Sequence, residues 1–205
     1  MEEMNYQDVV SNIQVYGLEE AVRGSKYSFA VDVNSVSAEI TPTIRRLANC
    51  GLGEGHDNFL NGILVQFDLT FSNKAWVEAE RYHFLDFVSS QSTMHRITKF
   101  DLSSGFMSYT NPEMIAILQK MVAEYNKIKE KDVADPRLNK KYLEILYSTP
   151  SGFRLTAKMT TNYRQLKTIY FQRRNHKLPE WRAFCRWIET LPEAELITGK
   201  SLTRV

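Results

Sequence analysis

Residues 63–71 carry the feature that most restricts how this chain can fold. Every second side chain in the segment is apolar, and Gln66, Asp68 and Thr70 stand between the apolar positions. This alternation is typical of a β-strand that buries one face. Residues 153–159 repeat the pattern late in the chain. The sequence therefore predicts two strands whose partners and covering helices come from distant segments.

Helical patterns surround these strands without alternating regularly with them. We expect helices over residues 43–50, 76–88, 112–128, 138–146, 162–174 and 178–192, with a turn or helix start at 18–23 and extended stretches at 13–16 and 27–33. A regular βαβ repeat would predict a doubly wound sheet, and none is present. The fold class expected is α+β: a single domain over residues 1–205, with a central antiparallel or mixed sheet flanked by helices.

Composition excludes several classes of protein. Cys50 and Cys185 are too few for a disulfide framework or a structural zinc site, and each is read as a small buried hydrophobe. No apolar run is long enough to span a membrane, and the acidic N-terminus does not resemble a signal peptide. A cytoplasmic location is the expectation. The four histidines lack the spacing of metal ligands, so no metal is predicted.

The net charge of +2 conceals an uneven distribution. Residues 154–186 hold nine Lys and Arg and one Glu, a local charge of +8, which leaves −6 for the rest of the chain. Such a segment is either a solvated basic face or a surface for an anionic ligand. The near-neutral total argues against a general nucleic-acid or polyanion binder and for a small phosphorylated ligand.

Two polar residues fall on the apolar side of the helix expected over residues 162–174. Leu166, Ile169 and Tyr170 define that side, and Asn162 and Arg173 lie in the same stripe. A buried guanidinium needs an anionic partner. The charge of Arg173 could be neutralised by an internal carboxylate or by a ligand. Alternatively, the long side chain could extend to solvent.

The helix expected over residues 76–88 shows a similar conflict. Glu80 and His83 lie within its apolar stripe, and Arg81 lies at the edge. Residues 89–96 then form a segment dense in small hydrogen-bond donors, which is either a plain polar loop or a wrap around a phosphate. Departures of this kind concentrate at functional sites.

Several short segments stand out by their order and spacing. They are residues 17–29, Gly55-His56-Asp57-Asn58-Phe59-Leu60, Arg81-Tyr82-His83, Ser89-x-Gln91-x-x-Met94-x-Arg96, Pro150 followed by Asn162-Tyr163-Arg164-Gln165-Leu166 and Arg173, and Glu180-Trp181-Arg182. In this order they resemble the motifs of the flavin-dependent thymidylate synthase family. The likeness spans most of the chain and lies in the order and spacing of the segments.

The resemblance implies an enzyme, a methyltransferase that converts dUMP to dTMP. In this family FAD relays a methylene group from methylenetetrahydrofolate to the uracil, and NADPH reduces the flavin. No cysteine attacks the pyrimidine, which agrees with the two ordinary cysteines here. The resemblance also implies a homotetramer with active sites between subunits, and a dUMP-like nucleotide as the ligand.

The resemblance also carries site residues over by position. The residues that would contact FAD are Ser28, His56, Asn58, Arg81, His83, Asn162 and Thr168. The residues that would contact dUMP are Glu78, Ser92, Arg96 and Arg173, and Arg173 would act catalytically by polarising the pyrimidine. A cationic helix facing a dianionic nucleotide would account for the +8 segment.

The chain departs from the family pattern at the Arg-His-Arg signature. Tyr82 stands at the central His, His83 stands at the second Arg, and a three-residue insertion precedes Ser89. Further family positions differ, with Asn61-Gly62 at a usual Glu-His, Glu78 at a usual Gln and Leu146 at a usual Arg. Three alternatives to thymidylate synthesis follow: a non-catalytic flavin- or nucleotide-binding homologue, an enzyme that modifies another pyrimidine nucleotide, and a basic nucleic-acid-binding module.

Overall fold

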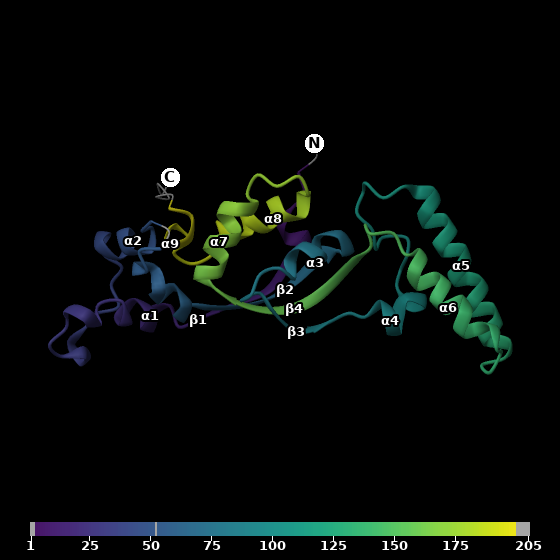
Figure 1. The fold of residues 1–205 in the computed structure, drawn as a ribbon, viewed down its shortest axis with the longest axis horizontal. Helices are drawn as coiled ribbons and strands as arrows, with labels where there is room; N and C mark the ends of the chain where they lie inside the picture. The colour runs from purple at the N-terminus through teal and green to yellow at the C-terminus, as the bar shows by residue number, and fades with distance from the viewer. Residues whose placement is uncertain (1–2, 52, 200–205) are drawn as a thin grey trace. The chain divides into compact units, whose positions relative to one another are not determined.

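The structure is a computed structural model, and it describes residues 3–51 and 53–199. Its strands are β1 (Val10–Tyr16), β2 (Leu64–Ser72), β3 (Asp86–Ser90) and β4 (Arg154–Asn162). Its helices are α1 (Leu18–Gly24), α2 (Pro42–Ala48), α3 (Asn73–Ala79), α4 (Thr93–Arg96), α5 (Pro112–Lys131), α6 (Arg137–Ser148), α7 (Tyr163–Arg173), α8 (Pro179–Ile188) and α9 (Glu195–Thr198). Strands and helices do not alternate as βαβ units, so the predicted α+β class is confirmed (Figure 1).

The strands form one sheet in the order β1-β2-β4-β3. Strand β1 pairs antiparallel with β2, with a bulge between Ser11 and Gln14. Asn12 lies in that bulge with a φ of 51°, a conformation that asparagine tolerates better than most residues. The sheet predicted from the alternating segments is therefore present, and its two central strands are the two that the alternation predicted.

The chain divides into two compact units. Unit 1 takes in the described residues of Met1–Leu69, Ala79–Val88 and Lys158–Val205, and unit 2 takes in Thr70–Glu78 and Ser89–Ala157. Strands β2, β3 and β4 each contribute residues to both units. The expectation of a single domain stays a prediction.

Helices α7 and α8 cover one face of β2 and β4 in unit 1 (Figure 1). The alternation of β2 places Val65, Phe67 and Leu69 on the buried face. The Phe67 ring lies 4.6 Å from that of Trp187 on α8. Burial of such aromatic side chains supplies the main stabilising term of this core.

Unit 2 contains a hairpin of α5 and α6 with its own core. Asn111 caps α5 by accepting a 2.8 Å hydrogen bond from the Glu113 amide, and Pro112 occupies the first turn. Leu118, Val122 and Ile145 are buried between the helices. The cap and the apolar stripe together determine where α5 begins and which face it buries.

The helix predicted over residues 76–88 is wrong. Helix α3 ends at Ala79, and the chain turns and continues as β3, a strand at the edge of the sheet. The hydroxyl of Thr161 donates a hydrogen bond to the carbonyl of Phe84, which joins this segment to β4. The backbone groups of β3 form hydrogen bonds with β4 and not with one another as in a helix. Strand pairing in the tertiary structure therefore overrides the helical spacing of the side chains.

The extended stretch predicted over residues 27–33 is also wrong. The chain forms short 3-10 turns at Tyr27–Phe29 and Val33–Ser35. The Lys26 ammonium donates to the carbonyls of Ser37 and Glu39, at 2.8 Å and 2.7 Å. These bonds fold the segment back on itself as a loop.

Gly17 allows the close approach of two backbone segments in unit 1. Its φ is +75°, and a Cβ built on it would lie 2.5 Å from the carbonyl oxygen of Gly62. We expect Gly17→Ala to lower the free energy of unfolding by about 2 kcal/mol or more, since both the left-handed conformation and the contact oppose a side chain. Chemical denaturation measures this.

Gly24 provides the matched control for Gly17. It lies in α1, and a Cβ added there meets no atom within 4 Å. Gly24→Ala is expected to be neutral or stabilising by up to about 1 kcal/mol. Equal destabilisation by the two substitutions would contradict the role given to Gly17.

Candidate functional site

A pocket of about 640 Å³ lies within unit 1 along α7. Its wall is formed by Asn49, Cys50, Gly53, Asp57, Asn61, Phe84, Asn162, Arg164, Gln165, Lys167, Thr168, Phe171 and Gln172. The lining combines aromatic rings, amides and two cations. Pockets of this size and mixed chemistry are typical of sites for cofactors and small ligands.

Asn162 sits where β4 ends and α7 begins. Its side-chain oxygen accepts a 2.8 Å hydrogen bond from the Gln165 amide, which is the ordinary geometry of an N-cap. The side chain is buried and its residue lines the pocket. The polar residue that the sequence placed in an apolar stripe is therefore a helix cap beside a pocket.

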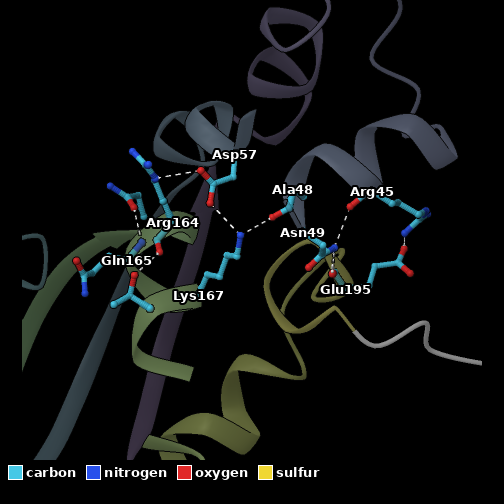
Figure 2. Close-up of polar contacts among 10 residues, drawn as sticks. Arg45, Ala48, Asn49, Asp57, Arg164, Gln165, Lys167 and Glu195 are labelled. Carbon is cyan, nitrogen blue, oxygen red and sulfur yellow. Dashed lines mark hydrogen bonds and ion pairs between the residues drawn. The ribbon is translucent and has the colours of Figure 1, made fainter. Parts of the chain in front are cut away.

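The carboxylate of Asp57 forms ion pairs with both cations that line the pocket, Arg164 and Lys167 (Figure 2). Lys167 donates to Asp57 at 2.8 Å, and the Arg164 Nε lies 3.4 Å from the other oxygen of the same carboxylate. The Lys167 ammonium also donates to the carbonyl of Ala48 at 2.7 Å. The side chains of Lys167 and Asp57 are only 15% and 14% exposed, so little water screens their attraction.

A second group of contacts fastens α2 beside this pocket. Asn49 donates to the backbone carbonyls of Arg45 and Glu195, and Arg45 pairs with the carboxylates of Glu193 and Glu195 (Figure 2). Because Asn49 itself lines the pocket, these bonds hold one wall in place.

Arg173 lies at the C-terminal end of α7 and is half-buried. Its Nε donates a 2.7 Å hydrogen bond to the Tyr82 hydroxyl, and its guanidinium lies 5.0 Å from the centre of the Trp181 ring. Tyr82 in turn donates to Gln172 at 2.9 Å. The position of the family's central His is therefore occupied by a tyrosine that contacts the arginine expected to polarise the pyrimidine.

The structure brings together two of the residues expected to contact flavin. Asn162 and Thr168 both line the pocket. Among the described residues that form its wall, Ser28, His56, Asn58, Arg81 and His83 do not appear, and all five are exposed. His56 and Asn58 nevertheless flank Asp57, which does line it.

The residues expected to contact dUMP are divided between the two units. Glu78 lies in α3, Ser92 immediately precedes α4, and Arg96 is the last residue of α4. These three residues belong to unit 2, whereas Arg173 belongs to unit 1. Glu80 and His83, expected within a helical stripe, lie exposed in the turn after α3. That expectation is wrong because the helix ends before them.

Sequence reasoning missed several residues that matter to this pocket. Asp57, Arg164, Lys167 and Phe171 were not assigned a role, although the two cations belong to the +8 segment. Asp57 gave no signal because its partners come from α7, far along the chain.

Cys185 is buried, as the composition predicted, whereas Cys50 is only partly buried and lines the unit 1 pocket. Burial raises the pKa of the Cys185 thiol to about 12, so it stays protonated and is a poor nucleophile. Within residues 3–51 and 53–199 no cluster of His, Cys, Asp and Glu is arranged to hold a metal ion. No helix in the same described ranges is long and apolar enough to cross a membrane.

Comparisons with solved structures identify a shared fold. Two structures of the flavin-dependent thymidylate synthase from Helicobacter pylori, both with FAD and dUMP, match with a TM-score of 0.67 and 14% identity. The match covers 92% of this chain and 98 to 99% of those chains.

A second neighbour is a methylase of related substrates. The UMP/dUMP methylase PolB from Streptomyces cacaoi, bound with 5-Br dUMP, matches with a TM-score of 0.58 and 15% identity over 92% of this chain and 96% of that one. No family model matches the sequence, and no curated protein matches it either. The resemblance stated from the sequence is thus supported at the level of structure: the chain has the fold of the flavin-dependent thymidylate synthases.

Proposed function

We propose that this protein binds FAD in the unit 1 pocket and methylates a pyrimidine nucleotide, with dUMP as the leading substrate. The observation that carries the proposal is the pocket itself. It joins Asn162 and Thr168, two positions expected on flavin, to the cations Arg164 and Lys167 in a fold shared with FAD- and dUMP-bound enzymes.

The residues of the pocket fit a flavin nucleotide. Phe84 and Phe171 offer apolar surface for a planar ring, and Asn162 and Gln165 offer amides for its polar edge. Arg164 and Lys167 suit a pyrophosphate. A bound flavin would supply the redox chemistry that converts a transferred one-carbon group into a methyl group.

The remaining parts of the proposed reaction follow from the resemblance. Methylenetetrahydrofolate would donate the carbon, and NADPH would supply the reducing equivalents. Glu78, Ser92, Arg96 and Arg173 would hold the nucleotide, with Arg173 stabilising negative charge that develops on the pyrimidine. The proposal includes a homotetramer and a cytoplasmic location.

Flavin binding is tested by titration with FAD, followed by visible absorbance and calorimetry. We expect one FAD per chain in the wild type. Thr168→Trp should weaken binding at least tenfold, because Thr168 is exposed on the pocket wall and an indole there would fill the space.

Asn175→Trp is the control for Thr168→Trp. Asn175 is exposed in the same unit and lies outside the pocket wall, so the Asn175→Trp variant should bind FAD with the affinity of the wild type. A wild-type protein that takes up no FAD would refute the proposal.

A non-catalytic flavin- or nucleotide-binding homologue is the second candidate, and the contact between Arg173 and Tyr82 favours it. Arg173 donates its Nε proton to a tyrosine that replaces the family's histidine. The test is formation of methylated product from dUMP and from UMP, with methylenetetrahydrofolate and NADPH present. Product from UMP alone identifies a different pyrimidine substrate, as the likeness to PolB suggests.

Absence of product from both nucleotides, with FAD still bound, supports the non-catalytic candidate. Growth of a thymidine auxotroph that carries this protein would exclude the non-catalytic candidate.

Tyr82→His restores the family residue. If the contact with Tyr82 limits what Arg173 can do, this variant should form product faster than the wild type.

A further inference from the structure

Arg173 contacts a second polar side chain besides the Tyr82 hydroxyl. Its Nη1 atom lies 2.8 Å from Nε2 of His176, a half-buried residue in the turn between α7 and α8. A guanidinium has no acceptor atom, so Arg173 donates this hydrogen bond and the imidazole accepts it. The resemblance assigns no role to His176.

The backbone of the turn ties His176 to both helices. Its amide donates to the carbonyl of Arg173 at 2.9 Å, and its own carbonyl accepts from Nη1 of Arg182 on α8 at 2.7 Å. The same Arg182 nitrogen donates to the carbonyl of Lys177 at 2.9 Å. The imidazole therefore projects from a turn that is held at both ends.

The two ring nitrogens of His176 face two different donors. Nε2 faces Arg173, and Nδ1 lies 3.2 Å from the amide nitrogen of Leu178. A neutral imidazole has one acceptor nitrogen, so the two donors compete for it. The bond from Arg173 is shorter and comes from a charged donor, which makes it the stronger of the two. The favoured tautomer therefore has its lone pair on Nε2, toward Arg173.

Contacts at two of its three nitrogens set the plane of the Arg173 guanidinium. Nε donates to Tyr82 and Nη1 donates to His176. The guanidinium also lies 5.0 Å from the centre of the buried Trp181 ring, and the His176 ring lies edge-on to the same indole at 6.4 Å. A planar group held in this way loses less conformational entropy when it meets a ligand.

We propose that His176 is a positioning residue for Arg173. Its imidazole accepts from Nη1 and keeps the guanidinium in the orientation that binds the pyrimidine nucleotide. The inference rests on the proposed function, in which Arg173 contacts that nucleotide. His176 acts through Arg173 and not on the ligand directly.

Two substitutions separate the bond to Arg173 from the other contacts of the ring. The side-chain oxygen in His176→Gln reaches about as far as Nε2, whereas the oxygen in His176→Asn reaches only about as far as Nδ1. Asparagine therefore keeps an acceptor for the Leu178 amide, and both variants lose the ring that packs against Trp181.

The expected loss of dUMP affinity differs between these variants. By calorimetry on the FAD-loaded protein, His176→Asn should bind dUMP about tenfold more weakly than the wild type, because the charged hydrogen bond is lost. His176→Gln should stay within about threefold of the wild type. Thermal unfolding should place both variants close to the wild type, since the backbone bonds of the turn do not depend on the ring.

A double-mutant cycle tests whether His176 acts through Arg173. In the Arg173→Ala background, adding His176→Asn should change dUMP affinity by less than about twofold, because the bond between the two side chains is already absent. A further tenfold loss in that background would overturn the proposal, since His176 would then reach the ligand by another route.

Other results would also overturn the positioning role. Equal losses in His176→Asn and His176→Gln would show that ring packing alone matters. Nitrogen NMR of the imidazole needs no dUMP, and a proton on Nε2 in the unliganded protein would contradict the bond from Arg173. A wild type that binds no dUMP refutes the proposed function together with this role, whereas wild-type affinity in His176→Asn refutes the positioning role alone.

Discussion

Arg173→Ala is expected to weaken the binding of dUMP at least 100-fold, measured by calorimetry on the FAD-loaded protein. The guanidinium is the one group of α7 that the resemblance places on the pyrimidine. It is half-buried between Tyr82 and Trp181, and its Nε already donates to a hydroxyl. A charged hydrogen bond in such a partly desolvated place accounts for about 3 kcal/mol, or about 100-fold in affinity.

Arg174→Ala is the control for Arg173→Ala. Arg174 is the next residue, and its guanidinium lies 5.3 Å from the centre of the exposed Phe171 ring. Removing it subtracts the same charge and a similar stacking contact, so dUMP affinity should change by less than about threefold. Equal losses in the two variants would mean that only net charge matters and would refute the role of Arg173.

Arg173→Lys separates binding from packing. Lysine retains the positive charge and much of the aliphatic stem but lacks the planar fork. We expect affinity for dUMP between those of the wild type and Arg173→Ala, with thermal stability close to wild type. A variant that unfolds at a much lower temperature without loss of affinity would show that the side chain serves the fold alone.

Opposite changes in FAD affinity are expected from the two partners of the buried pair in the unit 1 pocket. Lys167→Gln should weaken FAD binding at least tenfold, because it removes a cation that we place on the pyrophosphate. Asp57→Asn should tighten binding by about tenfold, since it frees Lys167 and Arg164 from an internal counter-ion that competes with the ligand. Titrations at a single ionic strength measure both effects.

Stability distinguishes this charge effect from damage to the fold. Asp57→Asn leaves the largely buried Lys167 ammonium without its carboxylate, so the free energy of unfolding should fall by about 2 kcal/mol. Lys167→Gln leaves Asp57 paired with Arg164, so the loss of stability should be smaller. Asp68→Asn is the control, because Asp68 pairs with Lys158 at 3.3 Å elsewhere in unit 1, so its FAD affinity should equal that of the wild type. If Asp57→Asn weakens FAD binding, then Asp57 positions the cations and does not compete with the ligand.

Some features of the site could be predicted from local sequence. The helix expected over residues 162–174 follows from its apolar stripe and is confirmed as α7, Tyr163–Arg173, whereas the structure shows that Asn162 is its N-cap and not a residue within the helix. The basic character of that region followed from counting charges. The contacts that decide its chemistry did not, because Asp57 meets Lys167, and Tyr82 meets Arg173, across long stretches of chain.

The sequence by itself determined the central strands, the mixed order of helices and strands, and hence the α+β class. These depend on burial periodicity within single segments, which local residues encode. Only the tertiary structure decided that residues after Ala79 turn away from helix to form β3, and that one carboxylate neutralises two cations of the pocket. Strand pairing at the edge of a sheet and ion pairing between distant elements depend on which surfaces meet after packing, and no local pattern specifies that.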